Sequence, residues 1–171
     1  VTVTEDAPDE TVDLSTTFTD VDDASLTLSI ANNTNPGLVT PTLSGTDLTL
    51  SFAADASGTA DLTVEAADGD GLTATSTFTV TVEPENDAPT VATPIADVTV
   101  TEDAPDETID LSTTFTDVDD ASLTLSIANN TNPGLVTPTL SGTDLTLAFA
   151  ADASGTADLT VEAADADGLT A

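Results

Sequence analysis

Apolar and polar residues alternate along most of the chain, which is the pattern of β-strands with one buried face. In the segment 77–82, the apolar residues Phe78, Val80 and Val82 are separated by threonines. The segments 26–30, 48–52 and 62–65 alternate in the same way, and no segment carries a helical period. The alternation predicts about seven strands in each unit of the chain, at 95–101, 11–18, 25–31, 38–43, 46–53, 59–67 and 72–83.

Turn-forming sequences separate the predicted strands. They include Asn35-Pro36-Gly37, Ser44-Gly45-Thr46-Asp47 and Asp68-Gly69-Asp70-Gly71. About seven short strands joined by such turns are typical of a two-sheet Greek-key sandwich. The chain has no Cys and no Trp, so it lacks the disulfide and the core Trp of antibody domains. We therefore predict an all-β chain made of tandem Greek-key β-sandwich domains.

An internal repeat organises the whole sequence. Residues 1–74 recur as residues 98–171, with the differences Val12/Ile109, Ser51/Ala148 and Gly69/Ala166. This period is longer than solenoid units and fits one small domain. We expect a first repeat at 1–83 that lacks its first segment, an acidic, Pro-bounded linker at 84–89, and a second repeat at 90–171 that lacks its last strand. We also expect the sequence to be an excerpt of a longer array.

The charge of the chain excludes several classes of function. It has 32 Asp and Glu residues and no Lys, Arg or His, so its formal net charge is −32. Without His or Cys, no Ser-His-Asp triad, Cys-His nucleophile or Cys/His zinc site can form. Nucleic acid would be repelled. Hydrophobic residues make up 39%, which is unlike a disordered acidic tail. No apolar run is long enough to span a bilayer, and no signal peptide is visible.

The acidic residues gather at predicted strand ends and turns. Aspartates form turns readily, so an isolated Asp-Gly pair such as Asp68-Gly69 needs no further explanation. Clusters that meet at one end of a sandwich would repel one another unless a cation lies among them. Calcium prefers carboxylate and carbonyl oxygens in loops. We therefore expect Ca²⁺ as a ligand, and the largest clusters lie at Glu5-Asp6, Asp20–Asp23, Asp68–Gly71 and Glu83–Asp87.

These motifs resemble the cadherin-like domains, including the bacterial cadherin-like and immunoglobulin-like repeats of large surface adhesins. The resemblance covers the whole unit, and its motifs are Val3-Thr4-Glu5-Asp6-Ala7-Pro8, Thr19-Asp20-Val21-Asp22, the segment 62–71 and Glu83-Pro84-Glu85-Asn86-Asp87-Ala88-Pro89. In that family, calcium ions lie at the junction of two domains and both domains supply ligands. The resemblance implies a junction site made of Glu5, Glu83, Glu85, Asn86, Asp87, Asp117, Asp119 and Asp165. Calcium within the loops of each domain is the alternative.

Calcium does not account for all of the acidity. One period, residues 1–97, carries 18 acidic residues. Three calcium ions, the largest number that the resemblance implies, would neutralise six charges and leave about −12. A marine or halophilic medium would account for the remaining negative charge, since salt screens it. Selection for solubility and self-repulsion in a crowded array fits it equally well.

Three functions follow from these features. The leading one is a structural extender of a long extracellular repeat protein, an adhesin stalk or surface fibre, which calcium makes rigid at the junctions between neighbouring repeats. The first alternative is a multi-chain extracellular filament of identical chains, joined through strand edges. The second is a module that binds carbohydrate or a partner cell with calcium, although the chain has no Tyr or Trp for an aromatic sugar platform. No enzymatic activity is expected, because the acidic pairs lie in turns of both repeats.

A weaker motif lies in the loop that follows residue 31. Asn32-Asn33-Thr34 and Asn129-Asn130-Thr131 match the acceptor pattern for N-glycosylation. In a loop rich in Thr, Ser and Asn, such a match also arises by chance.

Overall fold

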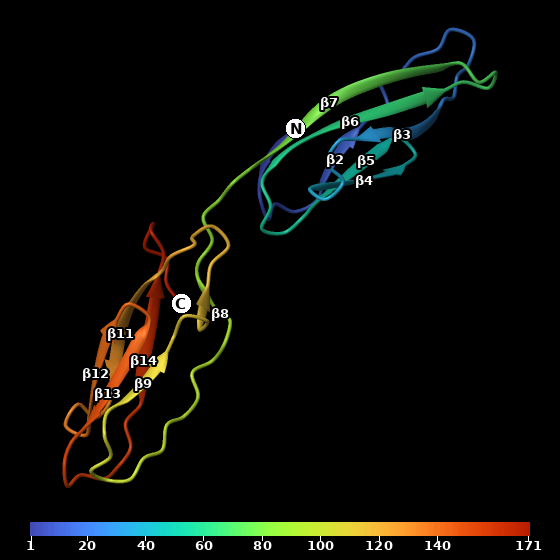
Figure 1. Cartoon of the computed structure of the whole chain (residues 1–171). Coiled ribbons are helices and arrows are strands. Elements are labelled where there is room, and N and C mark those ends of the chain that lie inside the picture. Colours follow the sequence, from blue (N-terminus) through green and yellow to red (C-terminus); the bar gives the residue numbers. More distant parts are fainter. The chain divides into compact units, whose positions relative to one another are not determined.

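The structure is a computed structural model that describes residues 1–171, and it consists of strands, turns and loops (Figure 1). Its contacts divide the chain into two compact units, Val1–Glu85 (unit 1) and Asn86–Ala171 (unit 2). The division falls inside the stretch 84–89 that the sequence indicates as a linker. None of its elements is a helix long and apolar enough to cross a membrane. The all-β prediction is confirmed.

Unit 1 is a sandwich of two sheets. One sheet has the strand order β1-β7-β6-β3 and the other β2-β5-β4. The connections β2–β3, β3–β4 and β5–β6 pass from one sheet to the other, as in a Greek key. The strands are β1 (Thr2–Thr4), β2 (Glu10–Asp13), β3 (Thr27–Asn33), β4 (Val39–Ser44), β5 (Asp47–Phe52), β6 (Gly58–Ala67) and β7 (Thr73–Glu83).

The core of unit 1 lies between the two sheets and follows the alternation of the sequence. Leu48 and Leu50 of β5 face the core and are fully buried. Alternate residues of a strand point to opposite faces, so the intervening threonines face outward. On the other sheet Leu62, Val64 and Val80 fill the same core.

Unit 2 repeats this arrangement in part. Its sheets have the orders β12-β13-β9, β11-β14 and β10-β8. Leu111, Val136, Leu145 and Leu147 form its buried core. The strands are β8 (Thr90–Val91), β9 (Glu107–Asp110), β10 (Phe115–Thr116), β11 (Thr124–Asn130), β12 (Val136–Ser141), β13 (Asp144–Phe149) and β14 (Leu159–Ala164).

One predicted strand is wrong, and its absence has a simple cause. Residues 95–101 form no strand. The matching strand of unit 1, β1, pairs in parallel with Thr81–Glu83 of β7. The described residues end at Ala171, which corresponds to Ala74 near the start of β7, so the counterparts of Thr81–Glu83 are not among them. The counterpart of β6 in unit 2 is β14, which is shorter than β6. The first residues of β6 pair only with β7, and the residues that would pair in the same way with β14 are not among those described.

The predicted strand 11–18 is also shorter than expected. It ends at Asp13, whose Oδ1 accepts a hydrogen bond of 2.7 Å from the backbone N–H of Ser15. This side chain bends the chain into a turn. In unit 2 the strand resumes at Phe115–Thr116, because these residues pair with Thr90–Val91. The short strand β8 was not predicted from the alternation.

Candidate metal-binding site

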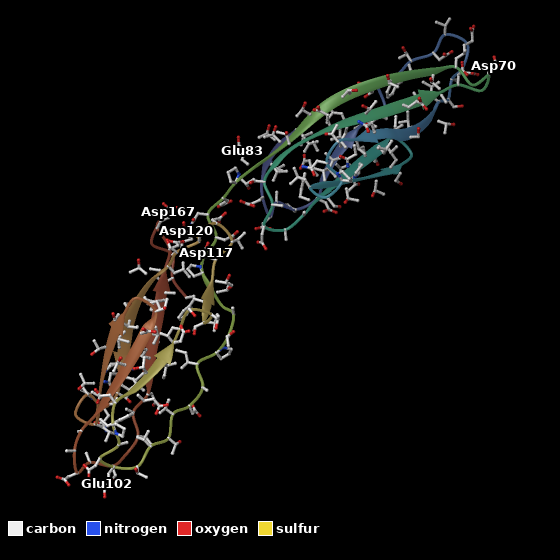
Figure 2. All side chains as sticks on the ribbon, in the orientation of Figure 1. Asp70, Glu83, Glu102, Asp117, Asp120 and Asp167 are labelled. Carbon is white, nitrogen blue, oxygen red and sulfur yellow. The ribbon has the colours of Figure 1, made fainter.

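Several acidic side chains of each unit lie at its ends (Figure 2). In unit 2, Asp117, Asp120 and Asp167 lie at one end and Glu102 at the other. In unit 1, Glu83 and Asp70 lie at opposite ends. The strands between them carry mainly Thr and Ser on their outer faces. The predicted ligands divide between two such ends, one in each unit.

Three predicted ligands meet at one end of unit 1, and we call them the unit 1 cluster: Glu5, Glu83 and Glu85. The Glu5 backbone N–H donates to the carbonyl of Glu83 at 2.9 Å, which extends the pairing of β1 with β7 by one residue. The Glu5 Oε1 accepts a hydrogen bond of 2.7 Å from the backbone N–H of Glu85. Glu5 is only 5% exposed, whereas the side chains of Glu83 and Glu85 are exposed.

The other five predicted ligands meet at one end of unit 2, and we call them the unit 2 cluster: Asn86, Asp87, Asp117, Asp119 and Asp165. The Asn86 amide donates to Asp165 Oδ2 at 2.8 Å. The Asp87 backbone N–H donates to Asp119 Oδ2 at 2.8 Å. The first residues of the unit are thereby attached to two loops that are distant in sequence.

In the loop after β10, one carboxylate oxygen of Asp117 accepts no hydrogen bond. Asp117 Oδ1 accepts from the backbone N–H groups of Asp119 and Asp120, at 2.9 and 2.8 Å. Asp117 Oδ2 is buried and has no hydrogen-bond partner. A buried acceptor without a donor costs free energy, and a bound cation is one way to remove that cost. This oxygen is the feature that best fits a metal ion.

Asp165 stays charged although it is buried. It is 7% exposed, and burial alone would raise its pKa. Hydrogen bonds from the Asn86 amide and from the backbone N–H groups of Leu169, Gly168 and Asp167 outweigh burial and lower the pKa of Asp165 below its ordinary value. A carboxylate that remains ionised in a buried position is suited to bind a cation.

The near-identical repeats show what the linker residues contribute. Glu102 is the counterpart of Glu5 but is exposed, and the positions that correspond to Glu83 and Glu85 lie outside the described residues. Asp68 is the counterpart of Asp165 but is only half-buried, and the position that corresponds to Asn86 lies outside the described residues. The same local sequence is therefore enclosed only where residues 83–87 meet it.

Sequence reasoning missed one member of the unit 2 end. Asp120 Oδ2 accepts from the backbone N–H of Ala166 at 2.8 Å, which ties the loop after β10 to the loop after β14. The acidic segment Asp117-Val118-Asp119-Asp120 was the available signal. In unit 1, Asp6 Oδ1 also accepts from the backbone N–H of Asp55 at 3.2 Å. Both aspartates have positive φ, 59° and 50°, a conformation that Asp tolerates better than most residues.

The chemistry of the two clusters fits calcium. Every side-chain group is a carboxylate or an amide carbonyl, and calcium takes six to eight such oxygens at flexible distances. No nitrogen or sulfur ligand is present, so the set does not suit zinc. Eight oxygen-bearing side chains with seven carboxylates provide enough ligands and charge for more than one ion.

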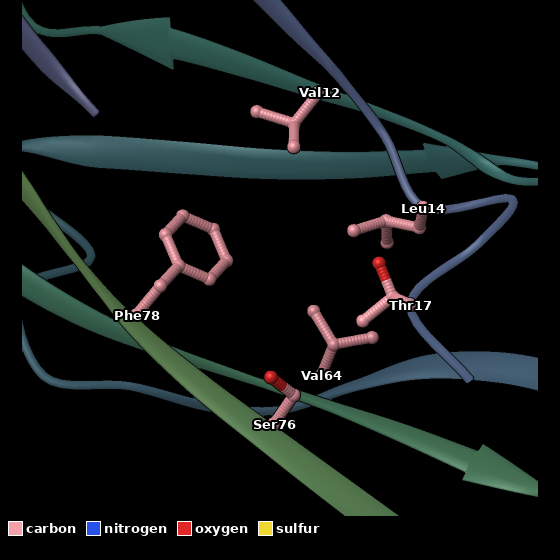
Figure 3. Close-up of a pocket in the computed structure, with 6 residues that line it drawn as sticks. All are labelled: Val12, Leu14, Thr17, Val64, Ser76 and Phe78. Atoms are coloured by element: carbon pink, nitrogen blue, oxygen red, sulfur yellow. The ribbon is translucent and has the colours of Figure 1, made fainter.

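A pocket of about 200 Å³ opens between the sheets of unit 1 and is shown in Figure 3. The pocket has no ionisable side chain among its lining residues, so it has no base that could activate the hydroxyl groups of Thr17 and Ser76. Its lining residues are Val12, Leu14, Thr17, Val64, Ser76 and Phe78. The pocket is a gap beside the core and has no arrangement that would perform chemistry.

Comparison with known proteins gives one family. Residues 1–81 match the family model of the bacterial Ig domain. A comparison with curated proteins gives no match.

Several solved structures resemble the chain in fold. Extracellular cadherin domains 1–4 of protocadherin gamma B7 align over 100% of this chain and 45% of that one, with 18% identity and a TM-score of 0.49. SGBP-B of the Bacteroides ovatus mixed-linkage glucan utilisation locus, solved in complex with a mixed-linkage heptasaccharide, aligns over 99% of this chain and 40% of its own, with 18% identity and a TM-score of 0.36. An endo-fucoidan hydrolase aligns over 100% and 26%, with 20% identity and a TM-score of 0.43. This chain thus spans less than half of these proteins.

The family match, the two-sheet architecture and the internal repeat lead to one assignment. The family model covers nearly all of unit 1. Residues 98–171 repeat the sequence of unit 1 with three differences. Unit 1 therefore matches the bacterial Ig domain, and residues 98–171 of unit 2 repeat its sequence.

Proposed function

We propose that this chain is part of a structural extender of a long extracellular protein, and that calcium stiffens the junction between its repeats. The observation that supports this most is the enclosure of Glu5 and Asp165 by the linker. Each is buried in the repeat that residues 83–87 contact, and its counterpart in the other repeat is more exposed. The residues that join the repeats thus complete both clusters.

The two clusters are adjacent in the covalent chain. The unit 1 cluster ends with Glu85 and the unit 2 cluster begins with Asn86. A calcium ion held by members of both clusters would restrict rotation about the few backbone bonds that separate them. Glu5 and Asp165 would supply buried carboxylates and Asp117 its buried Oδ2, and the exposed Glu83 and Glu85 would complete the ligand set.

Electrostatics explains why calcium would favour an ordered junction between the repeats. The eight predicted ligands carry seven carboxylates, and the chain has no cationic side chain to balance them. Without a cation, the like charges repel and favour separation of the repeats. Calcium supplies the missing positive charge, so binding is coupled to an ordered junction, which it stabilises by mass action.

Calorimetric titration of the chelator-treated chain tests this proposal. We expect calcium to bind, and Glu5→Gln to weaken at least one binding event tenfold or more, about 1.4 kcal/mol. Gln keeps the oxygen that accepts from Glu85 but removes the charge.

Glu102→Gln is the matched control, since the same substitution is made in the same local sequence at an exposed position without the linker. It should leave the binding isotherm unchanged. Equal effects of the two substitutions, or no heat on calcium addition, would overturn the proposal.

A further inference from the structure

The segment that follows Ile30 contains three asparagines, and the structure gives a role to two of them. Asn33 Nδ2 donates to the carbonyl of Val39 at 2.7 Å, and its Oδ1 accepts from the backbone N–H of Asn35 at 2.9 Å. Asn35 Nδ2 donates to the carbonyl of Thr59 at 3.3 Å. These bonds hold the turn between β3 and β4.

Asn32 has no such role. Its side chain is exposed and makes no hydrogen bond. It lies just after a β-bulge, where the register of β3 on β6 shifts between Ile30 and Asn32. The shift turns Asn32 to the outer face of the sheet. Asn129 occupies the same place in unit 2, exposed and after the same bulge.

The outer face around Asn32 is lined with hydroxyl groups. Asn32 pairs with Thr63, and Thr63 pairs in turn with Thr77 across the sheet. The Oγ1 atoms of Thr63 and Thr77 are 2.9 Å apart. The row Asn32-Thr63-Thr77 carries no charge itself, and Asp61 and Glu65 flank Thr63 on the same face of β6. The row offers donors and acceptors to a neutral polyhydroxyl group.

We propose that Asn32 and Asn129 are sites of N-glycosylation. Each is the first residue of an Asn-x-Thr acceptor pattern. In the transfer, Asn Nδ2 forms a bond to the anomeric carbon of a glycosyl diphosphate. The bond from that carbon to the diphosphate oxygen breaks, the diphosphate leaves with the bonding electrons, and a base of the transferase takes the amide proton. No oxidant or reductant is required.

The charge of the chain selects the kind of sugar. With a net charge of −32 and no cationic side chain, the surface repels an anionic sugar and provides no counter-charge. The attached sugar is therefore neutral and lies over the threonine row. This inference does not depend on calcium, so the failure of either proposal leaves the other intact.

Mass spectrometry of the protein isolated from the cells that make it tests the proposal. Trypsin has no site in this chain, so a protease that cleaves after acidic residues is used. It releases the fragment Ala24–Asp47, which has the same sequence as 121–144. We expect this fragment to carry the mass of at least one neutral sugar, and fragmentation to place that mass on the first asparagine of Asn-Asn-Thr.

Two variants produced in the same cells complete the test. Asn32→Gln gives the fragment 24–47 its own mass, and this fragment should carry no sugar while 121–144 stays modified. The melting temperature of the unmodified protein should not change, since Asn32 makes no hydrogen bond. Thr34→Ser keeps the acceptor pattern and the hydroxyl that accepts from the backbone N–H of Asp61, so modification should persist. An unmodified fragment, or sugar on Asn33, Asn35 or a threonine instead, would overturn the proposal.

Discussion

At the scale of single residues, the environment of a side chain depends on the segment that meets it and not on its neighbours in sequence. Glu5 and Glu102 share the surrounding sequence Val-Thr-Glu-Asp-Ala-Pro, yet one is buried and the other exposed. Asp165 is buried where Asp68 is not. The candidate ligands could be named from the sequence by resemblance. Their burial could not, because it requires residues 83–87 to fold back onto two separate loops.

The lowered pKa of Asp165 predicts how acid affects unit 2. Because this pKa is lower in the folded chain than the ordinary 3.8, the carboxylate stabilises the fold at higher pH. That contribution is lost as the pH falls through the folded pKa. In calcium-free buffer, Asp165→Asn should be less stable than the native chain near neutral pH, and the difference should shrink below pH 3.8.

Urea unfolding at a series of pH values measures this difference. Asp68→Asn is the control, since it makes the same substitution at the equivalent position without the Asn86 hydrogen bond. A difference for Asp165→Asn that stays constant across the series would contradict the assignment.

At the scale of elements, alternation predicted most strands because each has one buried face. It predicted β4, β5, β6 and β7 to within one or two residues. It failed for 95–101, where the apolar pattern is present but the counterpart of the pairing residues Thr81–Glu83 is not among the described residues. It also missed β8, since two residues are too short to show a period. Strand pairing depends on residues that are distant in sequence, so a local pattern of apolar residues does not predict it.

The different burial of two equivalent leucines predicts unequal costs for one substitution in a chain of residues 1–171. Leu62 is fully buried between β7 and the opposite sheet, whereas its counterpart Leu159 is only partly buried. Leu62→Ala should lower the free energy of unfolding of unit 1 by about 2–5 kcal/mol, because it leaves a cavity. Leu159→Ala should cost unit 2 less, since solvent already reaches that side chain.

Amide hydrogen exchange followed by mass spectrometry separates the two units. Ser51 of β5 and Ala148 of β13 differ, so peptides that contain them have different masses. Equal losses of protection from the two substitutions would contradict the packing described for unit 2.

At the scale of the whole molecule, the net charge of −32 has no internal compensation. Calcium at the junction would neutralise only part of this charge, and solvent and salt must screen the rest. Repulsion of this kind favours expanded states over the compact fold.

The melting temperature in chelator should therefore rise with sodium chloride. Between about 0.1 M and about 1 M, the Debye length falls from about 10 Å to about 3 Å. A reduction of the repulsion by about 1 kcal/mol would raise the melting temperature of a domain of this size by about 4–8 °C. Differential scanning calorimetry measures the change, and a melting temperature that does not respond to salt would show that the charges are already well separated.

The central claim is that calcium makes the junction between the repeats rigid. Small-angle X-ray scattering of the whole chain, with calcium and after chelation, tests it most directly. With calcium, the profile should fit one fixed arrangement of the two units, and after chelation only a mixture of arrangements should fit. Glu5→Gln should require higher calcium to reach the fixed profile, and Glu102→Gln should not. Identical profiles with and without calcium would contradict the claim.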